Sequence, residues 1–268
     1  MIEKRPAGSI HKQEGGWFTA HWHFSFDHYR DPEQMGIGPL RVFNDDTLAP
    51  GAIWPLHPHR DVESLTYVVE GRFRHQDDQG NDGELPAGSV QRMTLGRGAW
   101  HSEQNASRDE PVRFIQMWIL PHTPALPPSC EQRIFTQEHR RNRMLVVFCP
   151  DISLPAYSET AKSQGLPPPI PVHGKAVVVI TSLEAGNSGE YVLTAGGTGK
   201  GPSGGYLYVI SGEVVLNGGT ELGMADAAKI FDEDAIHLAA AEKSEAILVD
   251  VPQSYRPVGI WALAAHMS

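Results

Sequence analysis

The sequence predicts an all-β fold, and three observations carry that prediction. Glycine occurs 27 times and proline 21 times among the 268 residues, scattered so that they divide the chain into short segments. Those segments are rich in Val, Ile, Tyr, Phe and Thr, which favour strands. No segment keeps the 3.6-residue hydrophobic periodicity of a long helix. We therefore expect many short strands and few short helices.

The clearest strands are expected where apolar and β-branched residues run together, at 65–73, 112–119, 144–148, 176–180 and 245–249. The polar run 75–83 contains Asn, Asp and Gly, which tolerate left-handed backbone conformations and so predict a hairpin turn. Short helical turns are expected at 31–35 and 136–141. The aromatic-rich segment 17–26 is expected to serve packing rather than ligand binding.

Composition excludes several classes of protein. Hydrophobic residues at 40% and charged residues at 20% are typical of a globular chain. The formal net charge of −10 has the wrong sign for binding nucleic acid through its phosphates. No apolar run approaches the roughly 18 residues that span a bilayer, and the first residues lack a signal peptide's apolar stretch, so we expect a cytoplasmic protein without membrane attachment. Cys130 and Cys149 lack Cys-x-x-Cys spacing, which argues against a zinc ribbon or a disulfide framework.

A weak internal repeat predicts two domains. The segment Tyr67-Val68-Val69-Glu70-Gly71 recurs as Tyr208-Val209-Ile210-Ser211-Gly212, and each copy is followed by a turn, a further strand and a histidine, His101 or His237. The proline-rich stretches 121–128 and 165–171 resemble connections, because proline cannot donate to a strand ladder. We expect one β-domain over residues 1–135 and a diverged copy over residues 136–268.

Two pairs of residues in the first half predict a metal site. His57 and His59 are two positions apart, as are His101 and Glu103, so each pair points to one face of its strand. If the strands are neighbours, three imidazoles and a carboxylate meet. Such a nitrogen and oxygen set suits Fe(II), Mn, Ni, Co or Zn. Glu63 has the parity to compete with Glu103, and the residues alone leave both assignments open.

These motifs resemble those of the pirin family in the cupin superfamily. The resemblance lies in His57-Pro58-His59-Arg60, Met93 to Gly98, His101-Ser102-Glu103, and the N-terminal segments 24–29 and 40–46. It is strong over about residues 1–135 and weaker beyond. It implies a bicupin, two facing jelly-roll β-barrels, with one metal ion, commonly iron, in the first barrel. By the same resemblance the ligands are His57, His59, His101 and Glu103, while Glu63 does not ligate.

The second half departs from the metal-binding pattern. A shift of 141 residues, the spacing of the repeat, takes His57 and His59 to Thr198 and Lys200. After His237, the position that matches Glu103 holds Ala239. We therefore expect a degenerate barrel without a second metal centre.

The resemblance to bacterial pirin-like proteins with quercetin 2,3-dioxygenase activity implies a metal-dependent dioxygenase acting on a flavonol-like enolic substrate with O2. Glu103 would take the proton of the substrate hydroxyl. Trp54, Met93, Gln116 and Trp118 are candidates for contacting this small aromatic substrate. Two alternatives are a metal-binding regulatory or redox-sensing protein that acts through protein partners, and an isomerase that uses the metal only as a Lewis acid.

Overall fold

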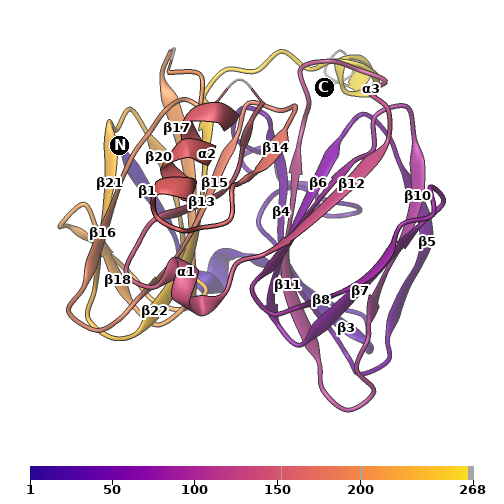
Figure 1. Ribbon diagram of the computed structural model, residues 1–268, viewed down its shortest axis with the longest axis horizontal. Coiled ribbons are helices and arrows are strands. Elements are labelled where there is room, and N and C mark those ends of the chain that lie inside the picture. Colours follow the sequence, from indigo (N-terminus) through magenta and orange to yellow (C-terminus); the bar gives the residue numbers. More distant parts are fainter. Residues whose placement is uncertain (152, 200, 265–268) are drawn as a thin grey trace. The chain divides into compact units, whose positions relative to one another are not determined.

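The computed structural model describes residues 1–151, 153–199 and 201–264, and the chain forms two compact units. The N-terminal unit comprises His11–Gly36, Leu40–Ile134 and the segment that begins at Arg256. The C-terminal unit comprises Met1–Ile10, Ile37–Pro39 and Phe135–Tyr255. The first strand of the chain, drawn in indigo in Figure 1, therefore lies among strands of the second half.

The N-terminal unit contains two antiparallel sheets. The seven-stranded sheet has the order β12-β9-β6-β11-β4-β3-β2, formed by β2 (His11–Glu14), β3 (Phe18–Trp22), β4 (Leu40–Leu48), β6 (Glu63–Glu70), β9 (Ser89–Thr94), β11 (Val112–Ile119) and β12 (Ser129–Ile134). The four-stranded sheet has the order β5-β10-β7-β8, formed by β5 (Ile53–His59), β7 (Arg72–Asp77), β8 (Asp82–Pro86) and β10 (Ala99–Asn105).

The C-terminal unit also has a seven-stranded and a four-stranded sheet. The larger has the order β1-β20-β17-β22-β15-β13-β14, formed by β1 (Ile2–Arg5), β13 (Leu145–Pro150), β14 (Ile170–Val172), β15 (Val177–Leu183), β17 (Ser203–Ser211), β20 (Ala227–Phe231) and β22 (Ser244–Pro252). The smaller has the order β16-β21-β18-β19, formed by β16 (Ser188–Val192), β18 (Val214–Leu216), β19 (Thr220–Leu222) and β21 (Ala235–Ala240). Strands β13 and β14 pair in parallel, and the other pairs are antiparallel.

The two units share one strand order. Strands β4 to β11 of the N-terminal unit occupy, in sequence order, the same places in their sheets as strands β15 to β22 of the C-terminal unit. The repeated segments fall on equivalent strands, β6 and β17, each of which is followed by a glycine with positive φ, Gly71 or Gly212. The duplication predicted from the repeat is confirmed.

The all-β prediction is also confirmed, with differences in detail. The strand expected over 65–73 is divided into β6 and β7 at Gly71 (φ 78°), where an added Cβ would lie 2.4 Å from the carbonyl oxygen of Pro111. Helix α1 (Gln137–Arg140) lies in the region expected to be helical, whereas 31–35 forms only a turn. Helix α2 (Leu154–Ser163) was not expected, although proline in its first turn is a helix-start signal.

The remaining helical segments are η1 (Ala7–Ser9) and α3 (Ile260–Ala264). Among the described residues, no helix has the length and apolar character that would be needed to cross a membrane.

Each unit contains a cluster of buried apolar side chains drawn from both of its sheets. In the C-terminal unit, one large cluster of buried apolar side chains draws on both sheets. In the N-terminal unit, a smaller cluster of this kind is formed by Leu48, Val68, Phe73, Leu85, Val112 and Phe114. Histidines and carboxylates occupy other inward positions of the same unit, beyond this cluster.

Candidate metal centre

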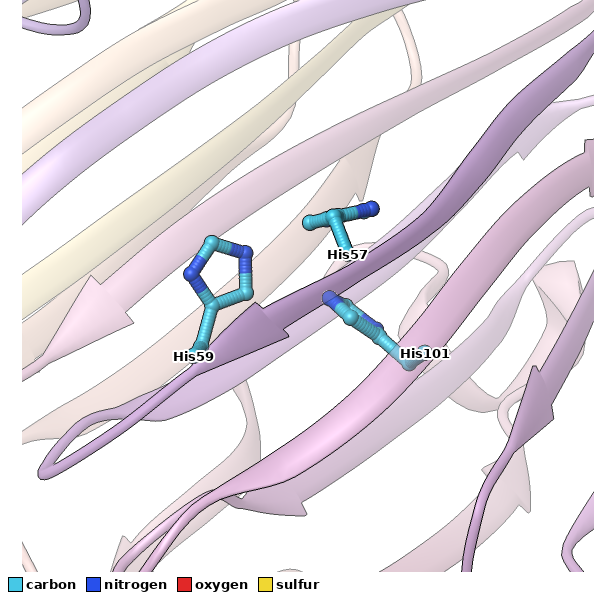
Figure 2. Close-up of side chains that lie close together, drawn as sticks. All are labelled: His57, His59 and His101. Atoms are coloured by element: carbon cyan, nitrogen blue, oxygen red, sulfur yellow. The ribbon is translucent and has the colours of Figure 1, made fainter.

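Strands β5 and β10 bring three histidines together. His57 and His59 lie two residues apart on β5, so both imidazoles leave the strand on the same side. His101 on β10 is the direct pairing partner of His57, and Ala99 is that of His59. Figure 2 shows the three rings converging from these two neighbouring strands. The local cause is the alternation of side chains, which the sequence already displays.

The three imidazoles are close enough to share one ion. One ring nitrogen from each histidine lies within 4.8 Å of those from the other two. The ring centroids are 4.8 Å apart for His57 and His59, 4.5 Å for His57 and His101, and 5.2 Å for His59 and His101. Within the described part of the chain, no other group of three or more such side chains meets this geometry.

One histidine has a tautomer fixed by its surroundings. The Nδ1 atom of His57 lies 2.7 Å from the carbonyl oxygen of Pro55, to which it donates a hydrogen bond. Its Nε2 atom therefore carries the lone pair. Metal-ligating histidines usually donate their second ring N–H in this way.

All three imidazoles are held in the neutral form that binds metals. Burial lowers the pKa of His57, lowers that of His59 to about 4 and lowers that of His101 to about 2, with a further lowering at His59 and His101 from neighbouring histidines. A neutral imidazole offers a nitrogen lone pair, whereas an imidazolium does not.

The most buried of the three lacks a partner within the protein. His101 is 1% exposed, and neither its Nδ1 nor its Nε2 atom has a hydrogen-bond partner. A buried polar group without a partner costs stability unless a ligand or water satisfies it. The donor set and this orphaned ring therefore fit a divalent transition metal.

Glu103 lies two residues after His101 on the same strand and is buried at 5% exposure. Its Oε1 atom accepts a hydrogen bond from Nε2 of Gln116 on β11. Burial raises the pKa of Glu103 to about 7, and the Gln116 hydrogen bond opposes this rise. The carboxyl group is therefore poised to exchange a proton near neutral pH. It is not part of the group of mutually close nitrogen atoms.

A cavity of about 280 Å³ opens onto these side chains. Its walls combine residues from both sheets with the segment that follows β3. Five of the lining residues are aromatic rings other than histidine, namely Phe18, Trp22, Phe26, Trp54 and Trp118. The others are Gln13, Asp27, His28, Asn44, Asp46, His57, His59, Glu103 and Gln116. A flat aromatic molecule with polar substituents is the kind of ligand that such a lining accommodates.

The predicted site residues divide into two groups. Trp54, Gln116 and Trp118 line the cavity, and the ring of Trp118 lies 4.5 Å from that of His59. Met93 is not among the lining residues; it is 2% exposed on β9, where it pairs with Ser64 and Cys130.

Glu63 lies away from the cavity. It is fully buried on β6 and accepts a hydrogen bond of 3.2 Å from the Thr94 hydroxyl. The neighbouring Ser64 is in register with Trp118, so Ser64 shares the cavity-facing side of the sheet while Glu63 points to the other side.

Sequence reasoning missed several lining residues and one buried histidine. The segment 17–26 was assigned to packing, yet Phe18, Trp22 and Phe26 line the cavity. His75 on β7 is 0% exposed, pairs with Glu103 and has its ring centroid 5.7 Å from that of His101, with neither ring nitrogen hydrogen-bonded. The sequence pattern could have identified His75 as an inward residue, because Phe73 and His75 alternate with Arg72 and Arg74.

The equivalent positions of the C-terminal unit follow from strand pairing. Glu103 pairs with His75, and Leu238 pairs with Leu216 in the same way. Leu238 therefore matches Glu103. Two residues earlier on these strands, Ile236 matches His101, and Tyr191, which pairs with Ile236, matches His57. All of these C-terminal residues belong to the apolar cluster.

The expected match of His237 to His101 is wrong by one residue. His237 points outward, with 59% of its side chain exposed and its Nε2 atom 3.7 Å from Glu190. A one-residue slip moves a side chain to the opposite face of a strand. Thr198 lies in the loop after β16, and Lys200 lies outside the described residues.

Comparisons with known proteins agree with this architecture. A family model described as Pirin matches residues 4–119, and one described as Quercetinase C-terminal cupin domain matches residues 161–251. The chain is 37% identical to a pirin-like protein of Caulobacter vibrioides, over 93% of this chain and 99% of that protein. It is 34% identical to a quercetin 2,3-dioxygenase of Escherichia coli K12, over 94% and 99%.

Solved structures give the same picture. The crystal structure of the bacterial pirin YhhW from Escherichia coli in complex with nickel(II) matches with a TM-score of 0.80 at 33% identity, covering 96% of this chain and 100% of that chain. The predicted bicupin, with two cupin units in one chain, is confirmed.

Proposed function

The chain belongs to the pirin family of cupin proteins, and from that premise we propose that it is a metal-dependent dioxygenase that cleaves a flavonol-like enolic substrate with O2. The observation that carries the proposal is the shared cavity. Two clustered histidines and the buried carboxyl of Glu103 open into a space walled by aromatic rings. Related proteins that carry the name quercetin 2,3-dioxygenase support it.

The proposed metal ligands are His57, His59, His101 and Glu103, holding one divalent ion. Fe(II) is our first choice, and Mn, Ni, Co or Zn also suit this set of nitrogen and oxygen atoms. Glu103 is preferred to Glu63 because Glu103 lines the cavity with two of the histidines, whereas Glu63 pairs with Thr94 outside the lining.

A metal ion held by these four residues would supply Lewis-acid and redox chemistry for the reaction of the enolic substrate with O2. Glu103 accepts the proton of the enolic hydroxyl as a general base. Gln116 orients the carboxyl by its hydrogen bond to Oε1. The aromatic walls position the planar substrate and exclude water.

Oxygen uptake by iron-loaded protein with quercetin tests the proposal. We expect one O2 consumed and one carbon monoxide released per flavonol cleaved. If the protein binds one iron but consumes no oxygen with any flavonol, the dioxygenase proposal fails and the regulatory alternative, acting through a protein partner, is favoured instead. Turnover of the substrate without oxygen consumption would point to a Lewis-acid isomerase.

A further inference from the structure

Two adjacent aspartates on β4 lie in opposite environments. Asp45 faces the side of the sheet away from the cavity, where the Arg113 guanidinium donates to both of its carboxylate oxygens, Nε to Oδ1 at 2.9 Å and Nη2 to Oδ2 at 2.7 Å. Asp46 points to the other face and lines the cavity. The contact with Arg113 therefore accounts for the buried carboxylate of Asp45. No such contact accounts for that of Asp46.

Asp46 has nothing to pair with in the protein. It is 6% exposed, and its Oδ1 atom is buried without a hydrogen-bond partner. No cation among the described residues offsets its burial; the charges that act on it are those of Glu103 and Asp45, and both are negative. Burying an unpaired carboxyl group is costly, so a residue of this kind usually marks a place where a ligand supplies the missing partner.

Asn44 repeats this pattern two residues earlier on the same face. It is 2% exposed, lines the cavity, and its Oδ1 atom is also buried without a partner. Asn44 is in register with Gln116, the residue that holds Glu103. The sheet opposite the histidines thus presents two unsatisfied polar groups, side by side, to the same space.

We infer that Asn44 and Asp46 form a hydroxyl subsite, which binds a phenolic hydroxyl group of the substrate other than the one whose proton Glu103 accepts. The inference rests on the proposed function and narrows its substrate class to polyhydroxylated flavonols. A hydroxyl group suits this pair because it donates and accepts, and so satisfies an amide and a carboxyl in either arrangement.

Burial, with the nearby Glu103 and Asp45 carboxyls, raises the pKa of Asp46 well above its ordinary value. These surroundings disfavour the charged form of the group, and its protonated form donates one hydrogen bond while accepting another.

The test compares two ligands that differ only in such hydroxyls. Quercetin and 3-hydroxyflavone share the 3-hydroxyl and the 4-carbonyl, but 3-hydroxyflavone has no other hydroxyl group. Zn(II)-loaded protein under argon binds without turnover, and quenching of tryptophan fluorescence reports occupancy because Trp22, Trp54 and Trp118 line the cavity. Each ligand is titrated into the wild type, Asp46→Leu and a control, Asp109→Asn, whose exposed side chain lies in the same unit outside the cavity lining.

We expect the wild type to bind quercetin at least about tenfold more tightly than 3-hydroxyflavone, since a hydroxyl lost from a buried polar subsite leaves its partners unpaired. In Asp46→Leu this ratio should fall towards one while the affinity for 3-hydroxyflavone is kept. Asp109→Asn should keep the wild-type ratio.

Stability gives a second, independent readout. Because Leu has nearly the shape of Asp without its unpaired oxygens, Asp46→Leu should raise the unfolding midpoint of the ligand-free protein. A purely structural role for Asp46 would lower it.

Two outcomes would overturn the inference, and they differ in what else they overturn. An unchanged affinity ratio in Asp46→Leu defeats the subsite and leaves the dioxygenase proposal standing; if the unfolding midpoint is lowered as well, the partner of Asp46 is a bound water. Failure of the wild type to bind either flavonol defeats the proposed function together with the subsite.

Discussion

The N-terminal and C-terminal units have the same strand order and opposite interiors. Where the N-terminal unit places His57, His75, His101 and Glu103, the C-terminal unit places Tyr191, Leu216, Ile236 and Leu238. In the first case His57 and Glu103 line a cavity, and in the second the equivalent side chains belong to an apolar core. One scaffold thus supports a reactive site or a packed core according to a few inward positions.

The polar interior of the N-terminal unit lowers the stability of that unit. The inner positions of the N-terminal unit include buried polar atoms without partners, on Asn44, Asp46, Thr66, His75 and His101. The equivalent cluster of the C-terminal unit consists of apolar side chains and Tyr191. Functional sites commonly retain such unfavourable groups because selection acts on activity as well as on stability.

The largest expected effect removes the metal. In the double variant His57→Ala, His59→Ala, only one histidine of the cluster remains, so metal content should fall from one equivalent per chain to nearly none. Elemental analysis of purified protein, with circular dichroism to confirm the fold, measures this. The comparison of the two units fails if a full equivalent is retained.

The matched control lies in the other unit. His237→Ala should leave metal content and oxygen uptake unchanged, because this side chain is exposed and the inward positions around it are apolar. Loss of metal in the folded variant would show that the C-terminal unit contributes a ligand.

The next effect separates the base from the ligands. Glu103→Gln should lower the turnover number by about 10² to 10⁴-fold, the usual contribution of a general base, since an amide cannot accept the proton. Part of the metal should remain on the three histidines. Oxygen uptake and iron content, measured on the same preparation, separate the two effects.

Glu63→Gln is the control for that experiment. Its hydrogen bond with Thr94 can be kept by an amide, so the effects on rate and on metal content should be smaller. If Glu63→Gln is inactive and Glu103→Gln is not, the proposed ligand set is wrong and Glu63 takes the place of Glu103.

An exchange of equivalent residues tests the stability comparison directly. Leu216→His puts an imidazole into the apolar cluster and should destabilise the C-terminal unit by about 2–4 kcal/mol. The reverse change, His75→Leu, removes a buried ring without partners and should stabilise the metal-free N-terminal unit by about 1 kcal/mol.

The chain offers a way to follow the two units separately. All six tryptophans, at positions 17, 22, 54, 100, 118 and 261, lie in the N-terminal unit, so tryptophan fluorescence in urea reports on that unit alone. Far-UV circular dichroism reports on both. Destabilisation by His75→Leu would mean that this ring has a structural partner.

The smallest expected effect is a pH dependence of the metal-free N-terminal unit. The pKa of His59 is about 4 in the folded chain and near 6.5 in the unfolded chain, so between these values only the unfolded state takes up the proton. Stability from this group is complete above pH 6.5 and is lost as the pH falls towards 4. The other three inward histidines shift in the same direction.

Buried carboxyls act against this trend. The pKa of Glu103 is about 7 in the folded chain and near 4.5 in the unfolded chain, so its contribution is complete below pH 4.5 and is lost as the pH rises through 7. Because four histidines outnumber Glu103 and Asp46, the unfolding midpoint, followed by tryptophan fluorescence, should decrease as the pH is lowered from 6.5 to 4.5. The fall should be steeper in Glu103→Gln, and an increase in the wild type would mean that the carboxyls outweigh the histidines.

The parts of the site that were predictable lie within single strands. His57 and His59, or His101 and Glu103, share a face because side chains alternate with a period of two, whatever the strand pairs with. Missed residues such as Asn44 and Asp46 sit on a strand where charged or polar neighbours occupy both faces. Alternation alone could not identify which face of that strand is the inner one.

The sequence by itself determined the all-β class, the duplication and the two pairs of candidate ligands, because strand propensity, turn residues and alternation are local properties of the chain. Only the tertiary structure decided the cross-strand register. Register depends on turn lengths and on which strands become neighbours, and a slip of one residue exposes His237 while placing Ile236 where His101 stands in the other unit. For the same reason, the carboxyl of Asp45 meets Arg113 while that of Asp46 faces the cavity without a partner.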